Sequence, residues 1–359
     1  MTSPLKIIYS CFLTNSGFTR ASLGYIRSLM SLSHDVHINC IHKYPHGDSF
    51  TNKELNIIKN TCQLNSMHGD ILIEHCIPHR WRESLTGQKR LCVAVAENEI
   101  IDPIWIERMN NRTHSIIYPG SWNKEIFEKS GVTRPGFVIP HFLDEDLWKD
   151  DNNDIKFFNK FSFCVIATWR DRKNWPLAFA SFEKLADNYD FIVGIKTDKP
   201  QVLSDYVIKN HPTIFNRIVI EETELDDQGM VNFMKKFDCI ANFSFGEAFC
   251  LPLLQGLFLG KPIVTTDIDG IRDYVNSDYA SLIKSNGTIS KDKMDHYRQF
   301  RDRIWPYFDV EESCRALSEI IEKYNSFKSN IQKDRYKLLE RFGLISSNKN
   351  AYWDPVLKL

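Results

Sequence analysis

The feature that most constrains the fold is a repeated alternation of short apolar runs with longer segments of helical periodicity. It begins with a strand predicted at residues 5–13, followed by a glycine and a helix at 19–32. After a polar stretch at 149–154 the alternation starts again, with a strand at 161–167 and a helix at 176–188. This pattern is typical of parallel sheets covered by helices. We therefore predict an α/β fold of two Rossmann-like, doubly wound domains facing each other across a cleft.

The chain of 359 residues is long enough for two such domains. We place them at residues 1–150 and 155–325, and we expect the polar tail at 326–359 to pack back on the first domain. Ligands of such sheets bind at the carboxyl ends of the strands. The other predicted strands are 35–41, 70–73, 91–96, 113–119, 190–195, 217–220, 238–242 and 262–266, and the other predicted helices are 123–129, 251–259 and 309–323.

Composition excludes several classes of function. The net charge of -1 argues against a non-specific nucleic-acid binder, which would carry a basic surplus. The nine cysteines form no C-x-x-C pair, which indicates reduced thiols rather than a disulfide framework. We find neither a signal peptide nor an apolar run of the ~18 residues needed to cross a bilayer. We therefore expect a cytoplasmic, soluble protein, and peripheral membrane association stays open.

The most informative segment is 244–255, which follows a predicted strand and opens a helix. Pro252 suits the first helical turn, where a missing N–H costs nothing. The N–H groups of Phe249, Cys250 and Leu251 would then point out of the helix start. Together with the helix dipole they would form an anion site suited to a diphosphate.

This segment resembles the E-x7-E region of the retaining family-4 (group 1) glycosyltransferases, which have the GT-B fold. Glu247 matches the first Glu of E-G-F-G-L-P-x-x-E, and Gln255 stands in place of the second. Phe249 and Leu251 match the F and L, whereas Cys250 replaces a glycine. The resemblance implies metal-independent transfer of a sugar from a nucleoside-diphosphate sugar to an acceptor hydroxyl, with retention of configuration and with no cofactor.

Under this resemblance Glu247 contacts hydroxyls of the donor sugar, and Gln255 holds the ribose or is a plain helix-surface residue. A basic cluster at 167–174 resembles the family's R-K-G or R-K-N element, whose cations bind the donor diphosphate. Cations there offset the negative charge that grows as the sugar leaves. Lys173 is the first candidate, Arg170 and Arg172 compete for a second role, and a solvated surface charge is the alternative for any one of them.

The first half offers weaker candidates. Gly17 lies in a strand-to-helix turn where the family has a glycine pair near the diphosphate and acceptor, although it also suits a simple turn. His75 matches the family's D-x-x-x-x-H, whose histidine contacts the donor sugar, and His79 is its rival; core or surface roles remain open for both. Glu97 follows a predicted strand and suits acceptor contact as well as a capping or structural role.

No metal is expected. The D-x-D patterns at Asp144–Asp146 and Asp267–Asp269 lie in a hinge and in a loop, and the cationic cluster suffices to hold phosphate. A zinc site from His75 and His79 would lack further ligands. The acceptor stays open among a glycan, a protein, a small molecule and a modified nucleic-acid base. The alternatives to a transferase are a catalytically inactive binding or scaffold protein, and an epimerase or phosphorylase-like protein of the same fold.

Overall fold

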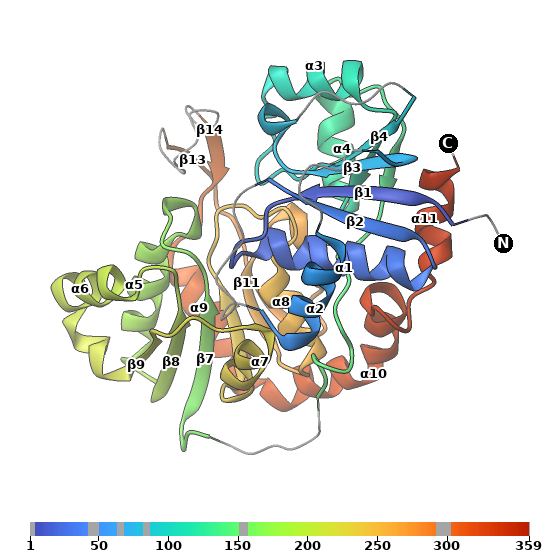
Figure 1. The fold of residues 1–359 in the computed structure, drawn as a ribbon. Helices are drawn as coiled ribbons and strands as arrows, with labels where there is room; N and C mark the ends of the chain where they lie inside the picture. Colours follow the sequence, from blue (N-terminus) through green and yellow to red (C-terminus); the bar gives the residue numbers. More distant parts are fainter. Residues whose placement is uncertain are drawn as a thin grey trace. The chain divides into compact units, whose positions relative to one another are not determined.

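The computed structural model describes residues 4–41, 50–62, 68–81, 87–150, 157–291 and 303–358. The chain divides into two compact α/β units (Figure 1). The first unit comprises Met1–Leu147, Glu224–Gln228 and Leu338–Leu359. The second comprises Trp148–Thr223 and Gly229–Lys337.

The first unit contains a six-stranded parallel sheet in the order β2-β1-β3-β4-β5-β6. Its strands are buried because helices pack on the sheet, which is why they read as continuous apolar runs. The strands are β1 Lys6–Cys11, β2 Asp35–Cys40, β3 Ile71–His75, β4 Lys89–Val93, β5 Ser115–Tyr118 and β6 Gly136–Val138. The helices are α1 Gly17–Ser31, α2 Asn52–Thr61, α3 Pro103–Arg112, α4 Ser121–Lys129 and α11 Lys349–Leu357.

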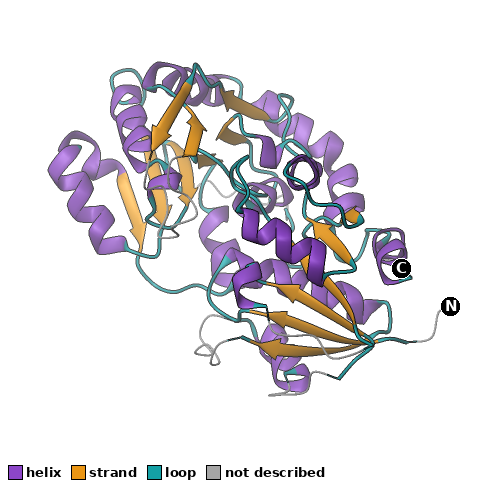
Figure 2. Cartoon of the chain, turned by 90° about the horizontal axis from the view of Figure 1, so that it is seen from above, coloured by secondary structure: helices purple, strands orange, loops and turns teal. Residues whose placement is uncertain are grey.

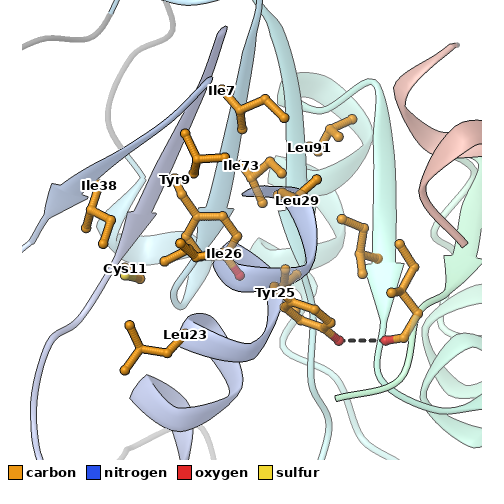
Figure 3. Close-up of a cluster of buried hydrophobic side chains, with 14 of the residues drawn as sticks. Ile7, Tyr9, Cys11, Leu23, Tyr25, Ile26, Leu29, Ile38, Ile73 and Leu91 are labelled. Atoms are coloured by element: carbon orange, nitrogen blue, oxygen red, sulfur yellow. Dashed lines mark hydrogen bonds between the residues drawn. The ribbon is translucent and has the colours of Figure 1, made fainter. Parts of the chain in front are cut away.

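The core of the first unit packs α1 against the apolar side chains of β1, β2 and β3 (Figure 3). The hydroxyl of Tyr25 on α1 donates to the Ile139 carbonyl at 2.6 Å. The indole N–H of Trp353 donates to the Ser28 hydroxyl at 2.8 Å, so α11 is joined to α1 as well. These buried polar contacts fix α1, whose first turn follows β1, against the sheet.

The second unit contains a six-stranded parallel sheet in the order β12-β11-β10-β7-β8-β9. Figure 2 shows helices packed along the strands. The strands are β7 Phe161–Ile166, β8 Phe191–Lys196, β9 Ile218–Glu221, β10 Cys239–Asn242, β11 Ile263–Thr266 and β12 Ala280–Ile283, and β13 Thr288–Lys291 pairs with β14 Arg303–Pro306 in a separate two-stranded sheet. The helices are α5 Trp175–Leu185, α6 Pro200–Asn210, α8 Leu251–Phe258 and α9 Val310–Glu322, together with α7 Asp227–Lys235, whose first two residues group with the first unit.

The segment predicted as a polar tail is largely helical. Helix α10 spans Tyr324–Phe342 and α11 follows it. The division between the units falls within α10, so residues up to Lys337 group with the second unit and those from Leu338 with the first. Most of the predicted linker, residues 151–154, lies outside the described residues. No described helix has the length and apolar character needed to span a membrane.

Candidate functional site

Strand order marks one place in each sheet where a ligand is favoured. In the second unit β7 lies between β10 and β8, so the chain leaves β7 in one direction and later returns to its other side. In the first unit β1 lies in the same way between β2 and β3. Ligands of open α/β sheets bind at such switch points, beside the carboxyl ends of the strands. The candidate residues that follow β7, β10, β1 and β3 therefore lie where this rule expects them.

The basic cluster follows β7 as a single 3-10 turn, Asp171–Lys173. Asn174 ends the turn in the left-handed conformation, with φ 54° and ψ 46°. Asparagine tolerates this conformation better than most residues, and Pro176 then occupies the first turn of α5. The turn holds Arg172 and Lys173 at the carboxyl end of the sheet.

The structure brings Lys173 and Glu247 together, although they are 74 residues apart. The Lys173 ammonium forms a hydrogen-bonded ion pair with Oε1 of Glu247, and Arg172 NH1 lies 3.2 Å from Oε2. The Ser244 hydroxyl donates to Oε1 at 2.6 Å. Glu247 is only 6% exposed, so this carboxylate is enclosed and compensated by charge.

The ionisation of Glu247 follows from these contacts. Burial alone would raise its pKa, but Lys173 and Arg172 lower it to about 2. Burial raises the pKa of the neighbouring Cys250 thiol to about 12 and the pKa of the Tyr274 phenol well above its usual value. The site therefore holds a permanent anion between two cations, with neutral groups behind it.

The start of α8 has the geometry expected of a phosphate-binding turn. Cys250 caps the helix with φ 59° and ψ 70°, the left-handed region that favours glycine, and Pro252 lies in the first turn. The Tyr274 hydroxyl donates to the Cys250 carbonyl at 2.9 Å and to the Phe249 carbonyl. The side chains of Phe249 and Leu251 are buried, so these two residues offer a ligand only their backbone.

A close approach between two loops holds Glu247 from the other side. A side chain at Gly270 would place its Cβ 1.8 Å from the Glu247 carbonyl oxygen. Only glycine permits that approach. The loop after β11, which contains Gly270, is thus packed directly on the Glu247 segment.

Arg170 and Gln255, which were also predicted to contact the donor, lie in surroundings different from those of Lys173 and Glu247. Arg170 pairs with Asp198, with 3.7 Å between NH1 and Oδ2, and NH1 also donates to the Trp169 carbonyl at 3.0 Å. Gln255 is buried on α8, and its side-chain amide has no hydrogen-bond partner among the described residues. Gln255 therefore lies in the helix that begins at the Cys250 turn, whereas Arg170 is directed toward the end of β8.

His75 ends β3 and is almost fully enclosed. The hydroxyls of Tyr9 and Ser22 each lie 2.8 Å from its Nδ1. The rings of Phe18 and His141 pack beside it, with centroid distances of 4.6 and 6.4 Å. Burial and the nearby His141 lower the pKa of His75 well below its usual value, so the imidazole is neutral.

The other first-unit candidates are separate from this cluster. His79 is exposed, and its Nδ1 accepts a hydrogen bond from the Trp105 indole at 3.0 Å. Glu97 is half-buried in the loop after β4. Gly17 is the first residue of α1, directly after Ser16, which caps the helix by accepting from the Thr19 N–H. Neither His79 nor Glu97 shares a hydrogen bond with His75 among those described.

Both D-x-D patterns are held by protein cations or amides. Asp144 pairs with Arg27 at 2.5 Å, and Asp269 pairs with Arg272 at 2.5 Å. Glu145, between the first two aspartates, accepts from the Ser346 N–H at 2.9 Å. No group of three or more candidate metal ligands occurs within the described ranges.

Several site residues were not identified from the sequence. Ser244, Tyr274, Tyr9 and Ser22 complete the surroundings of Glu247, the helix start and His75. Ser244 lies three residues before Glu247 at the end of β10, and that proximity could have drawn attention to it. Tyr9 and Tyr274 are distant in the sequence from the residues they contact, so neither contact could be predicted from a local motif.

Comparison with solved structures finds the same fold. The chain is similar to Anabaena HepE solved in complex with UDP-glucose, with a TM-score of 0.72, 13% identity, and coverage of 99% of this chain and 100% of that one. It is also similar to a glycosyltransferase from Rickettsia africae, with a TM-score of 0.70, 14% identity, and coverage of 99% and 98%. The pneumococcal O-GlcNAc transferase GtfA, in complex with UDP and GlcNAc, matches 80% of this chain over 56% of its own length, with a TM-score of 0.58 and 12% identity.

No protein-family model and no curated protein sequence matches the chain. The structural similarity therefore establishes the architecture, which the two parallel six-stranded sheets display directly. The chain has the two-Rossmann-domain GT-B fold.

Proposed function

We propose that the protein transfers a sugar from a nucleoside-diphosphate sugar to an acceptor hydroxyl, with retention of configuration and without a divalent metal. The observation that carries the proposal is the ion pair of Lys173 with Glu247 at the switch point of the second sheet. Close to it in the sequence is the turn at Cys250, whose left-handed backbone conformation is one that glycine favours. The fold shared with a protein solved in complex with UDP-glucose supports it.

The second unit supplies the donor-side chemistry. Lys173 and the start of α8 offer a charged donor and backbone N–H groups to the diphosphate. Glu247 accepts a hydrogen bond from a hydroxyl of the sugar. As the bond between the anomeric carbon and the diphosphate breaks, negative charge grows on the phosphate oxygens, and Lys173 stabilises it.

Retention follows if the acceptor hydroxyl attacks the face from which the diphosphate leaves. The acceptor oxygen bonds to the anomeric carbon, the bond to the diphosphate breaks, and a phosphate oxygen takes the acceptor's proton. This route requires no protein base. His75, neutral and enclosed, suits a hydrogen bond to the sugar rather than proton abstraction.

The ion pairs made by aspartates of the two D-x-D patterns support metal independence. Asp144 and Asp269 are each paired with an arginine. Lys173 uses one of its three N–H donors on Glu247, which leaves two for the diphosphate. We expect donor consumption to persist in excess EDTA. Loss of turnover in EDTA and its recovery on adding manganese would contradict this part of the proposal.

A donor screen tests the proposal directly. The protein is mixed with UDP-, GDP-, ADP- and dTDP-sugars, starting with UDP-glucose, and both the melting temperature and the release of nucleoside diphosphate are measured. We expect one nucleotide class to raise the melting temperature and to be consumed. Binding without consumption, with or without candidate acceptors, would favour the second candidate, a non-catalytic binding protein. Gln255, in place of a ribose-binding carboxylate, is the observation that favours that candidate.

A further inference from the structure

Both oxygens of the Glu247 carboxylate are already bound by the protein. Oε1 accepts from Lys173 and from the Ser244 hydroxyl, and Oε2 lies 3.2 Å from Arg172 NH1. A carboxylate oxygen accepts about two hydrogen bonds. Oε1 is therefore filled, and Oε2 keeps one direction for a donor hydroxyl.

Arg172 is bound to the Glu247 segment at more than one point. Its NH1 donates to the Gly246 carbonyl at 2.5 Å, and its own carbonyl accepts from the Phe245 N–H at 2.9 Å. The residue is 7% exposed. These contacts join the turn after β7 to the segment after β10, and they direct the guanidinium to the protein.

Ser244 anchors the same segment to the sheet. Its hydroxyl lies 2.8 Å from the Asn242 carbonyl oxygen Oδ1, and its backbone carbonyl accepts from the Thr266 hydroxyl at 2.6 Å. Asn242 in turn donates to the Thr265 hydroxyl at 3.1 Å. Ser244 is fully buried, so its hydroxyl is held between β10 and Glu247.

We propose that Arg172 and Ser244 are positioning residues for Glu247, and that the diphosphate is bound by Lys173 and the start of α8 without Arg172. Arg172 and Ser244 orient the carboxylate so that the remaining acceptor direction of Oε2 meets one hydroxyl of the donor sugar. This inference rests on the proposed function. It assigns diphosphate binding to Lys173, which also contacts Glu247, and not to Arg172.

The electrostatics of the pocket predict how such a role is detected. Among the described residues, the titratable and charged groups that interact electrostatically with Glu247 are Lys173, Arg172, Cys250 and Tyr274. Burial keeps Cys250 and Tyr274 neutral, so the two cations hold Glu247 ionised. Arg172→Met removes one of these cations and raises the pKa of Glu247, whereas Arg172→Lys retains the charge. The pH below which kcat falls on the acid side should therefore be higher in Arg172→Met than in the wild type, and it should rise less in Arg172→Lys.

A double-mutant cycle separates the positioning role from phosphate binding. Donor hydrolysis and affinity for free nucleoside diphosphate are measured for the wild type, Arg172→Met, Glu247→Gln and the double variant. We expect Arg172→Met alone to lower kcat by about 10-fold or more, with nucleotide affinity changed by less than about 2-fold. In the Glu247→Gln background it should lower kcat by less than about 2-fold, because the residue it orients is already lost.

Matched controls come from the same unit. Arg217→Met removes an arginine that pairs with Asp190 at 2.6 Å, away from the site, and should leave both measurements unchanged. Ser244→Ala should lower kcat without weakening nucleotide binding. Ser181→Ala removes another fully buried hydroxyl, which donates to the Leu177 carbonyl at 2.6 Å, and controls for loss of packing.

The outcomes are distinguishable. If Arg172→Met weakens nucleotide binding about 10-fold and its effect multiplies with that of Glu247→Gln, Arg172 is a phosphate ligand and this inference is wrong while the proposed function stands. If the wild type consumes no donor, the proposed function is wrong and the inference fails with it.

Discussion

The carboxyl ends of β10 and β3 occupy comparable places, each beside the switch point of its own sheet, yet they hold side chains of different kinds. The end of β10 leads to Glu247, a buried anion between two cations. The end of β3 carries His75, a neutral imidazole held by two hydroxyls and surrounded by aromatic rings. Both groups are enclosed, but only the first is enclosed as an ion.

The difference shows how the fold accommodates each buried group. Burying a charge is costly unless it is paired and hydrogen-bonded, and Glu247 has both kinds of partner. His75 instead avoids the cost by remaining uncharged. Under the proposed function, the charged group would act where charge develops in the reaction, and the neutral group would bind uncharged hydroxyls.

The comparison predicts that the charged site carries the largest catalytic effect. We expect Glu247→Ala and Lys173→Ala each to lower turnover by at least ~10²-fold, in line with the loss of one preorganised transition-state contact. Turnover is measured with the donor found in the screen. Circular dichroism is expected to show an intact fold for both variants.

Exposed residues of the same types serve as controls. Glu222→Ala and Lys209→Ala lie on the surface of the second unit and should retain wild-type turnover. If Glu247→Ala or Lys173→Ala behaves like these surface variants, that residue has no part in the reaction.

The second prediction concerns acid stability and separates the neutral cluster from the charged one. Burial lowers the pKa of His141, beside His75, to about 3, so below 6.5 the unfolded state binds a proton that the folded state does not. His141 therefore costs about 1.4 kcal/mol of stability for each pH unit below 6.5. His141→Phe removes this cost, and its stability relative to the wild type should rise by that amount as the pH falls. Urea unfolding at several pH values measures the difference.

Glu247 provides the contrast in the same experiment. Its pKa is lowered to about 2, so its stabilising contribution is complete above 4.5 and is lost only as the pH falls from there toward 2. The difference between Glu247→Gln and the wild type should therefore stay constant from pH 7 to about 4.5. Asp227, whose pKa burial raises to about 7, titrates in the same window but is unchanged in every variant compared. The comparison would be reversed if the stability difference between Glu247→Gln and the wild type changed with pH in this window, or if that between His141→Phe and the wild type did not.

The third prediction tests the hydroxyl support of His75. Tyr9→Phe removes one of the two hydroxyls on Nδ1 and leaves the ring in place. A typical buried hydrogen bond contributes about 1 kcal/mol, so we expect a loss of about that stability and a decrease in turnover of up to ~10-fold. Tyr336→Phe, on an exposed tyrosine of α10, is the control. Unchanged stability and turnover in Tyr9→Phe would mean that Ser22 alone holds the imidazole.

The two regions also differ in how far the sequence predicted them. The apolar runs at β7 and β10 and the turns that follow them are local signals, so Lys173 and Glu247 were both identified. Their partners were not fully identified, because the ion pair of Arg172 with Glu247 depends on β7 and β10 being neighbours in the sheet. Around His75 the partners come from β1 and α1, and a single strand motif carries no information about them.

The same reasoning explains which elements were missed. Strand β12 lies at the edge of its sheet, and a serine and a following lysine interrupt its apolar residues, so no continuous apolar run marks it. Helix α10 is rich in lysine, arginine and asparagine, so its sequence resembles a polar tail, although lysine and arginine are good helix formers. Local patterns predicted the layers, whereas contacts between distant elements decided the site.

The smallest predicted effect concerns Gln255, which lies on α8. Its substitution tests how far the charged site extends along this helix. Glu247 and Gln255 flank the turn at the start of α8, before and after it in sequence. If Gln255 contacts the ribose, its amide oxygen accepts only part of what a carboxylate would accept from the two ribose hydroxyls. A charge-assisted hydrogen bond is about twice as strong as a neutral one. We therefore expect Gln255→Glu to tighten binding of free nucleoside diphosphate by about 1 kcal/mol, measured by titration calorimetry. Weaker binding in this variant would mean that a second carboxylate repels the diphosphate more than it attracts the ribose, and that the donor site of this chain is completed by Glu247 and its two cations without an acid at position 255.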